Sequence, residues 1–361
     1  MRKLFFILII SLLSTLKTKG QIANIQDSLE LVNFFNSANG SNWTNNSGWL
    51  SGPVKNWFGI SINPTGRVTM IDLYNNNLTG KIANINLPFL NFFRLESNLL
   101  TDTIPNFNLP NLEQLYLHGN NLSGSIPNFS LPRLKWIYLF GNRLTGSIPN
   151  FNFPIVEVLN FAGNQLSGSI PNFNFPNLKV LALHLNNLSG SIPNFNFPFL
   201  QSISLANNVL SGPIPNFNIT TLQEISLGGN QLSGPIPEFN LPMLNRLILE
   251  SNPIPGTIPN FNLPLLEFLA LGNCQLTGTI PDFNMPALRV LKLWNNQLTG
   301  SIPDFSMPAL TELQLMNNQL SGPVPNFSFP NLALSSLQDN KFLRKNCPNI
   351  FAVVYCFGKL H

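Results

Sequence analysis

Residues 112–127 read LEQLYLHGNNLSGSIP, and residues 134–149 repeat the pattern as LKWIYLFGNRLTGSIP. Both segments carry leucine or isoleucine at the first, fourth and sixth positions, asparagine at the ninth and Ile-Pro at the end. The Ile-Pro step, or Val-Pro in the last copy, returns every 22 residues from Ile104 to Val324 without an insertion, and a degenerate copy starts at Ile82. A fixed period of this size indicates a repeat architecture in which each copy packs mainly on its neighbours.

The leucine spacing predicts one short strand in each copy. In the pattern x-x-L-x-L-x-x, the two leucines point to one face of a strand and the alternate residues point to the other face. Stacked copies would therefore bury a continuous core that a single copy cannot form.

The asparagine position predicts a buried ladder, because a side-chain amide can pair with backbone groups that a tight turn leaves unbonded. Its thirteen members are Asn76, Asn98, Asn120, Asn142, Asn164, Asn186, Asn208, Asn230, Asn252, Cys274, Asn296, Asn318 and Asn340. We expect Cys274 to replace asparagine as a small buried group.

The repeat resembles the leucine-rich repeat, and its continuation L-S/T-G-x-I-P is similar to that of plant receptor ectodomains and exported bacterial surface proteins. The resemblance covers about residues 22 to 345. It implies a leucine-rich repeat solenoid, conventionally classed as α/β but dominated by strands, with about 13 rungs of 22 residues. The parallel sheet would line the concave side, and the convex side would contain little helix.

Two further columns fit a convex side without helices. Proline at positions 105 and 110 returns in most copies and opposes helix formation, although Thr220 interrupts the second column. Phenylalanine from Phe107 to Phe327 recurs in register, and we expect these rings to stack as a spine.

The chain divides into four expected parts: a signal peptide at 1–20, an N-terminal cap at 21–67, repeats at 68–340 and a C-terminal cap at 341–361. The first part has basic residues followed by an apolar run from Leu4 to Leu13, which is typical of an export signal. An uncleaved anchor is the alternative, but this run is too short to span a bilayer. No other segment could span one, so we expect no membrane span after removal of the signal.

The N-terminal cap is expected to begin with a short helix, capped at Asp27 and paired with Glu30, that ends at Asn39-Gly40. Trp43, Trp49 and Trp57 would close the first rung. The segment resembles the plant-type cap but lacks its flanking cysteine pair, which favours a microbial exported protein.

The C-terminal cap contains Cys347 and Cys356, which we expect to form a disulfide in an exported chain. Two buried free thiols are the alternative. A zinc site with His361 would lack a fourth ligand, so no metal site is expected.

The charge distribution argues against nucleic acid as a partner. Of the 19 basic residues, four lie in the first twenty positions and four follow Asn340, which leaves 11 basic against 15 acidic residues between 21 and 340. This mildly acidic body offers no basic stripe for phosphates. The expected location is secreted or on the cell surface, and the sequence leaves the oligomeric state open.

The concave columns, which lie six, four and two residues before each ladder position, are aromatic in the first rungs. Three of the four tyrosines of the protein occur there. We expect a binding surface for an extracellular protein or polysaccharide at Tyr74, Phe92, Arg94, Glu96, Tyr116, His118, Trp136, Tyr138 and Phe140. The alternative is aromatic pairing that only stabilises the sheet.

A second, weaker patch is expected around Trp294, with Phe268, Val290, Lys292 and Met316. No catalytic residue, metal ligand or cofactor is expected anywhere in the chain. Asp72 and Glu96 could approach one another as glycosidase carboxylates do, but Arg94 between them makes ion pairing the better interpretation.

Serine and threonine beside the repeated glycine form another regular array, for example Ser125, Ser147 and Ser169. With the asparagine columns, such an array could bind ice or a crystalline polysaccharide. The competing interpretation is that these residues satisfy the turns of the repeat.

The sequence therefore predicts an exported, non-catalytic recognition protein that binds a protein or glycan on its concave face. A structural or adhesive cell-surface element and an ice- or crystal-binding protein are the alternatives.

The first testable prediction concerns export. Because the apolar run is short and Gly20 is small, cleavage after Gly20 should leave Gln21 as the first residue. N-terminal sequencing of the secreted protein checks this, and peptides that contain Arg2 or Lys3 in the mature protein would contradict it.

Overall fold

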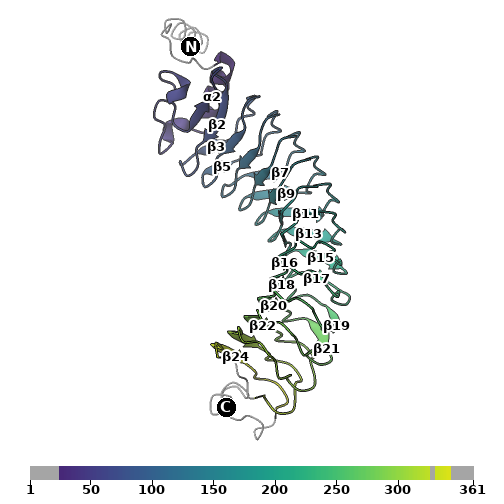
Figure 1. Ribbon diagram of the computed structural model, residues 1–361. Coiled ribbons are helices and arrows are strands. Elements are labelled where there is room, and N and C mark those ends of the chain that lie inside the picture. Colours follow the sequence, from purple (N-terminus) through teal and green to yellow (C-terminus); the bar gives the residue numbers. More distant parts are fainter. Residues whose placement is uncertain (1–23, 326–329, 343–361) are drawn as a thin grey trace.

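The computed structural model describes residues 24–325 and 330–342. Figure 1 shows coils of chain stacked into a curved solenoid, with helix α2 at one end and strand β24 towards the other. The predicted leucine-rich repeat architecture is confirmed: a long parallel sheet runs through the stack, and α2 is the only α-helix within the described ranges.

The main sheet has fourteen strands, of which β1 alone is antiparallel to its neighbour. Its strands, in spatial order, are β1 (Ile60–Ile62), β2 (Val68–Asp72), β4 (Phe92–Arg94), β6 (Gln114–Tyr116), β8 (Trp136–Tyr138), β10 (Val158–Asn160), β12 (Val180–Ala182), β14 (Ser202–Ser204), β16 (Glu224–Ser226), β18 (Arg246–Ile248), β20 (Phe268–Ala270), β22 (Val290–Lys292), β23 (Glu312–Gln314) and β24 (Leu334–Ser336).

A second sheet follows the turn after the ladder, which the sequence analysis did not anticipate. It contains β7 (Ser123–Ser125), β9 (Arg143–Gly146), β11 (Gln165–Ser169), β13 (Asn187–Gly190), β15 (Val209–Gly212) and β17 (Gln231–Leu232). Two separate two-stranded sheets occupy the corresponding place in rungs before and after it, β3 (Thr79–Lys81) with β5 (Leu99–Thr101) and β19 (Pro255–Thr257) with β21 (Gln275–Thr277).

The asparagine ladder connects successive coils by the same bonds in almost every rung. Asn186 Oδ1 accepts from Leu166 N of the preceding coil at 3.0 Å, and its Nδ2 donates to the carbonyls of Phe161 and Leu183 at 3.0 Å each. The side chain is 7% exposed. Each asparagine therefore satisfies one backbone donor and two acceptors where the chain turns away from the sheet.

Cys274 keeps only half of this function. Its Sγ donates to the carbonyls of Leu249 and Gly272, but it offers no amide oxygen to the preceding coil. The backbone N–H of Ile254 bonds instead to the carbonyl of Asn252 at 2.8 Å. Pro253, which has no N–H, stands where the second sheet would continue, so that sheet stops at β17.

The predicted phenylalanine spine is present but changes column in the middle. Phe107, Phe129 and Phe151 stack with ring centroids 6.1–6.3 Å apart, and a second run stacks from Phe239 to Phe305. Between these runs, the stack is formed by the inner column Phe153, Phe175 and Phe197, where the other described rungs carry leucine, isoleucine or methionine. Phe327 lies outside the described residues.

The spacing of these rings explains the curvature. Neighbouring strands in a sheet lie about 4.8 Å apart. The phenylalanine rings on the opposite side stand more than 6 Å apart, so each coil is wider on that side. The main sheet therefore lines the concave face and the spine underlies the convex face.

The N-terminal segment covers the first parallel strand, β2. It contains α2 (Ile25–Ser37) and the short 3₁₀ helices η1 (Gly40–Asn42) and η2 (Val54–Asn56). Trp43, Trp49 and Trp57 are buried there, and each neighbouring pair has ring centroids 4.9 Å apart. In the same segment, Asn45 N donates to Asn76 Oδ1, and Asn76 Nδ2 donates to the Asn45 carbonyl. The backbone of Asn45 thus provides the partners that a preceding coil provides in later rungs.

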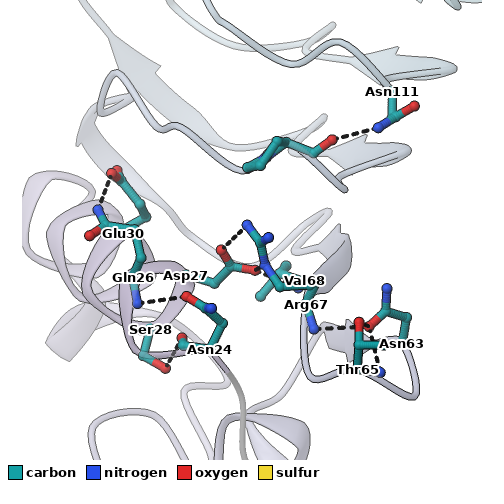
Figure 2. Close-up of polar contacts among 11 residues, drawn as sticks. Asn24, Gln26, Asp27, Ser28, Glu30, Asn63, Thr65, Arg67, Val68 and Asn111 are labelled. Carbon is teal, nitrogen blue, oxygen red and sulfur yellow. Dashed lines mark hydrogen bonds and ion pairs between the residues drawn. The ribbon is translucent and has the colours of Figure 1, made fainter.

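The helix cap differs from the prediction. Asn24, not Asp27, caps α2 by accepting from Gln26 N at 2.9 Å. Asp27 is fully buried instead, where it accepts from both Nε and Nη2 of Arg67 and from Val68 N, as Figure 2 shows. Its carboxylate therefore joins the helix to β2, which sequence spacing within the helix could not reveal.

Some expected features lie outside the described residues: the signal peptide at 1–20, the disulfide between Cys347 and Cys356, and most of the C-terminal cap at 341–361, including His361. Within the described ranges, no helix is long and apolar enough to cross a membrane.

The ladder gives the second prediction. Replacing Asn186→Leu should lower the free energy of unfolding by about 1–3 kcal/mol, because it leaves the buried Leu166 N–H and two carbonyls without their partner. The exposed neighbour Asn187 provides a matched control, since Asn187→Gln should change the free energy of unfolding by less than about 0.5 kcal/mol. Urea denaturation checks both, and equal midpoints for the two variants would contradict the ladder's contribution.

The third prediction concerns thiols. Burial raises the pKa of the Cys274 thiol to about 11, so little thiolate exists near neutral pH and native Cys274 should not react with a thiol reagent. After denaturation without reductant, the chain should expose one thiol if Cys347 and Cys356 are bonded to each other. Three reactive thiols would reject the disulfide, and rapid reaction of native Cys274 would show that it is not buried.

Candidate binding surface

Strand register places the concave side chains in straight columns. Asp72 of β2 pairs with Arg94 of β4, Arg94 with Tyr116 of β6, and Tyr116 with Tyr138 of β8. The residues two positions later on each coil, including His118 and Phe140, form the next column. The structure thus brings the predicted residues of the first four rungs onto one surface.

The aromatic rings on this surface stand on edge. Tyr116 and Tyr138 stack with centroids 5.1 Å apart and ring planes inclined by 8°, and His118 and Phe140 stack at 4.2 Å and 19°. Phe92 contacts Tyr116 at 5.7 Å. Because the rings face one another along the solenoid, the surface presents ring edges and phenolic hydroxyls rather than flat ring faces.

We call this surface the aromatic patch and define it as Tyr74, Phe92, Tyr116, His118, Trp136, Tyr138 and Phe140. Trp136 follows Gln114 in the outer column and makes no ring contact within the described residues. Burial raises the pKa of Tyr116 and of Tyr138, so both phenols stay protonated. The Tyr116 hydroxyl donates to Gln114 Oε1 at 3.2 Å, and the Tyr138 hydroxyl can donate to a ligand. Burial, together with the nearby charge of Arg94, lowers the pKa of His118, which is therefore neutral at pH 7.

Charged residues lie at the N-terminal edge of the aromatic patch. Arg94 donates from Nε to Glu96 Oε1, and its Nη1 lies 3.6 Å from Asp72 Oδ2. The guanidinium carbon also lies 4.1 Å from the centroid of the Tyr74 ring. We call Asp72, Arg94 and Glu96 the charge cluster, and its ion pairing agrees with the interpretation preferred over a catalytic carboxylate pair.

The middle rungs carry smaller side chains, among them Val158, Ala162 and Ser204. His184 lies in this region, and its Nδ1 is 3.0 Å from Ser204 Oγ. Desolvation lowers the pKa of His184. No group of three metal-ligating side chains is placed to hold an ion among the residues that the structure describes.

Trp294 belongs to a separate surface, nine rungs beyond Glu96 of the charge cluster. A Cβ on Gly272 would lie 2.3 Å from Trp294 Nε1, so the indole rests on the backbone of the preceding rung. Phe268 nearby has the Arg246 guanidinium 4.0 Å from its centroid and Lys292 Nζ at 5.6 Å. Sequence reasoning missed Arg246, although its position in a concave column one repeat before Phe268 could have signalled it.

The hydroxyl array lies on the second sheet. Ser125, Ser147 and Ser169 are exposed, and their hydroxyls make no hydrogen bond within the described part of the chain. They do not satisfy turns of the repeat, in contrast to Thr277, whose hydroxyl donates to the carbonyl of Gly256.

Comparisons with known proteins agree with this architecture. The family described as Leucine Rich Repeat matches residues 111–130 and 221–240, and Leucine Rich repeats (2 copies) matches residues 286–328. A search of the curated proteins gives no match.

Solved structures give clear similarities. The LRR ectodomain of the plant membrane receptor kinase GASSHO1/SCHENGEN3 from Arabidopsis thaliana, in complex with Casparian strip integrity factor 2, is 31% identical with a TM-score of 0.83, over 91% of this chain and 43% of that one. The plant peptide hormone receptor RGFR1 in complex with RGF2 is 32% identical with a TM-score of 0.68, over 80% and 53%.

A plant ice-binding protein is 23% identical with a TM-score of 0.62, over 90% of this chain and 96% of that one, and this likeness concerns the fold alone. The present chain spans about half the length of the plant receptor chains that it matches. The repeats, their ladder and these similarities together identify the chain as a leucine-rich repeat protein.

Proposed function

We propose that this protein is a non-catalytic extracellular recognition protein whose concave face binds an extended segment of a peptide or protein. The aromatic patch is the observation that carries the proposal. Soluble surfaces rarely gather so many partly exposed rings in one place without a partner. Tyrosine and tryptophan are also enriched where proteins bind other proteins.

The orientation of the rings favours a peptide over a stacked sugar. A sugar ring usually packs against a flat, open aromatic face. In the aromatic patch, Tyr116 covers a face of Tyr138, and His118 covers a face of Phe140. Ring edges and protonated phenols instead suit side chains and backbone carbonyls of a peptide.

The solved relatives support the same class of ligand and an extracellular location. One is a peptide hormone receptor in complex with RGF2, and another is the ectodomain of a membrane receptor kinase. The apolar N-terminal segment of this chain agrees with export.

A second candidate function uses the other sheet. Ser125 ends β7, Ser147 directly follows β9 and Ser169 ends β11, so their free, exposed hydroxyls recur at regular spacing along this sheet. Such an array supports binding to ice or to a crystalline polysaccharide, and repeated lateral contacts would also suit an adhesive element.

The fourth prediction separates these functions, because they use different surfaces. Once a displayed peptide library, an extracellular protein panel and a glycan panel have identified a ligand, Tyr116→Ala combined with Tyr138→Ala should weaken binding about 100-fold, as expected for central interface aromatics. Tyrosine substitutions at Ser125, Ser147 and Ser169 should have no effect on this binding. Circular dichroism controls for folding.

The same two variant sets are compared in an ice recrystallisation assay. Activity that is lost only in the serine set would reject concave recognition in favour of the second sheet. Retained binding in both sets would also reject it and would direct attention to Trp294.

A further inference from the structure

Unsatisfied polar atoms are concentrated at one end of the concave face. Within the described residues, four buried side-chain polar atoms have no hydrogen-bond partner: Trp57 Nε1, Asp72 Oδ1, Glu96 Oε2 and His118 Nδ1. The last three belong to consecutive rungs and face the concave side. An unpaired buried polar atom costs about 1–3 kcal/mol, and native proteins contain few of them. Carboxylate oxygens only accept, so the two unpaired ones indicate a site that lacks hydrogen-bond donors, whereas His118 Nδ1 accepts or donates according to its tautomer.

Arg94 accounts for the unpaired carboxylate oxygens. It contacts Oδ2 of Asp72 and Oε1 of Glu96, so the second oxygen of each carboxylate is left without a donor. Glu96 is only 5% exposed, so leaving its second oxygen unpaired destabilises the folded protein. The site therefore retains acceptor capacity that its own arginine does not fill.

The charges of the site do not balance. Asp72 and Glu96 carry two negative charges, and Arg94 supplies one positive charge. His118 faces the same space in its neutral form, and Tyr74 and Tyr116 are uncharged. One negative charge is thus uncompensated at the edge of the aromatic patch.

We propose that the charge cluster binds the ammonium or guanidinium group of a basic residue in the ligand, so that the concave face selects peptides with a lysine or arginine. This inference rests on the proposed function, since it specifies the chemistry of a peptide bound to the same face. Charge-assisted bonds from a cation would satisfy the unpaired oxygens and neutralise the excess charge.

The surroundings fit a long basic side chain. Met70 and Phe92 pair across β2 and β4 beside Asp72, and both are partly exposed, so they can pack against an aliphatic stem. The unpaired oxygens are closed to solvent, so a neighbouring side chain must move to admit the incoming group. Tyr74 is 51% exposed and its ring packs against the Arg94 guanidinium, so this side chain can move without opening the core.

A cation explains the site better than a neutral hydroxyl group. A hydroxyl could donate one hydrogen bond but would leave the excess negative charge in place. An ammonium offers three donors and a guanidinium five, and either brings the missing charge.

The experiment selects peptides from a displayed random library on the purified full chain and measures the enrichment of lysine and arginine. The best peptide is then synthesised with lysine or arginine and with norleucine at the enriched position. Binding of both forms is measured for the wild type, Asp72→Asn, Glu96→Gln and the control Asp282→Asn. Asp282 is exposed on the convex side, so its substitution changes the net charge equally without touching the site.

The expected result is clear enrichment of basic residues. Asp72→Asn and Glu96→Gln should each weaken binding of the basic peptide about tenfold. Asp282→Asn should leave it unchanged, and the norleucine peptide should be insensitive to all three substitutions. Circular dichroism confirms that the variants are folded.

Two other outcomes would overturn the proposal. Selected peptides without basic enrichment, or equal binding by wild type and Asp72→Asn, would reject the cation site while leaving concave peptide recognition intact. A selection that yields no concave-face binder would reject the proposed function and this inference together.

Discussion

The bond between a ladder asparagine and the backbone N–H of the preceding coil is the interaction on which the rest of the structure depends. Leu166 N to Asn186 Oδ1 and Leu188 N to Asn208 Oδ1 are two of its copies. Each coil turns sharply after its strand, and the turn leaves backbone groups inside the core that water cannot reach. The asparagine satisfies them and at the same time fixes how far one coil is displaced from the next.

This constraint determines the concave surface. Because almost every coil repeats the same bonds, Asp72, Arg94 and Tyr116 lie in one column although 22 residues separate each from the next. The backbone N–H and carbonyl groups already have hydrogen-bond partners within the sheet and the ladder, so the outward side chains are free to vary. Function can therefore be concentrated in a few rungs, as in the aromatic patch, while the others carry small residues.

Much of this could be predicted from the sequence, because period and spacing are local properties. The strand positions, the ladder, the concave columns and the ion pairing of Arg94 all follow from residue patterns that repeat. The buried pair of Asp27 with Arg67 could not be predicted in the same way, since it depends on a contact across 40 residues. Because Asp27 is engaged in that pair, the cap of the helix is Asn24 instead.

The orientation of the aromatic rings could not be predicted from the sequence either. The columns predicted that Tyr116 and Tyr138 would be neighbours, but only their geometry reveals that the rings stand on edge and disfavour a stacked sugar. Likewise, the sequence indicated charges near the patch, whereas the unpaired oxygens of Asp72 and Glu96 appear only once the position of Arg94 is known.

The central functional claim is that the concave face recognises a peptide through a direct contact between its acidic edge and a basic ligand residue. A double-mutant cycle tests this contact most directly, combining Asp72→Asn in the protein with lysine to norleucine in a selected peptide. The account predicts a coupling free energy of about 1.5 kcal/mol or more, as found for close charge pairs. Effects that add within about 0.5 kcal/mol would show that the two groups do not meet.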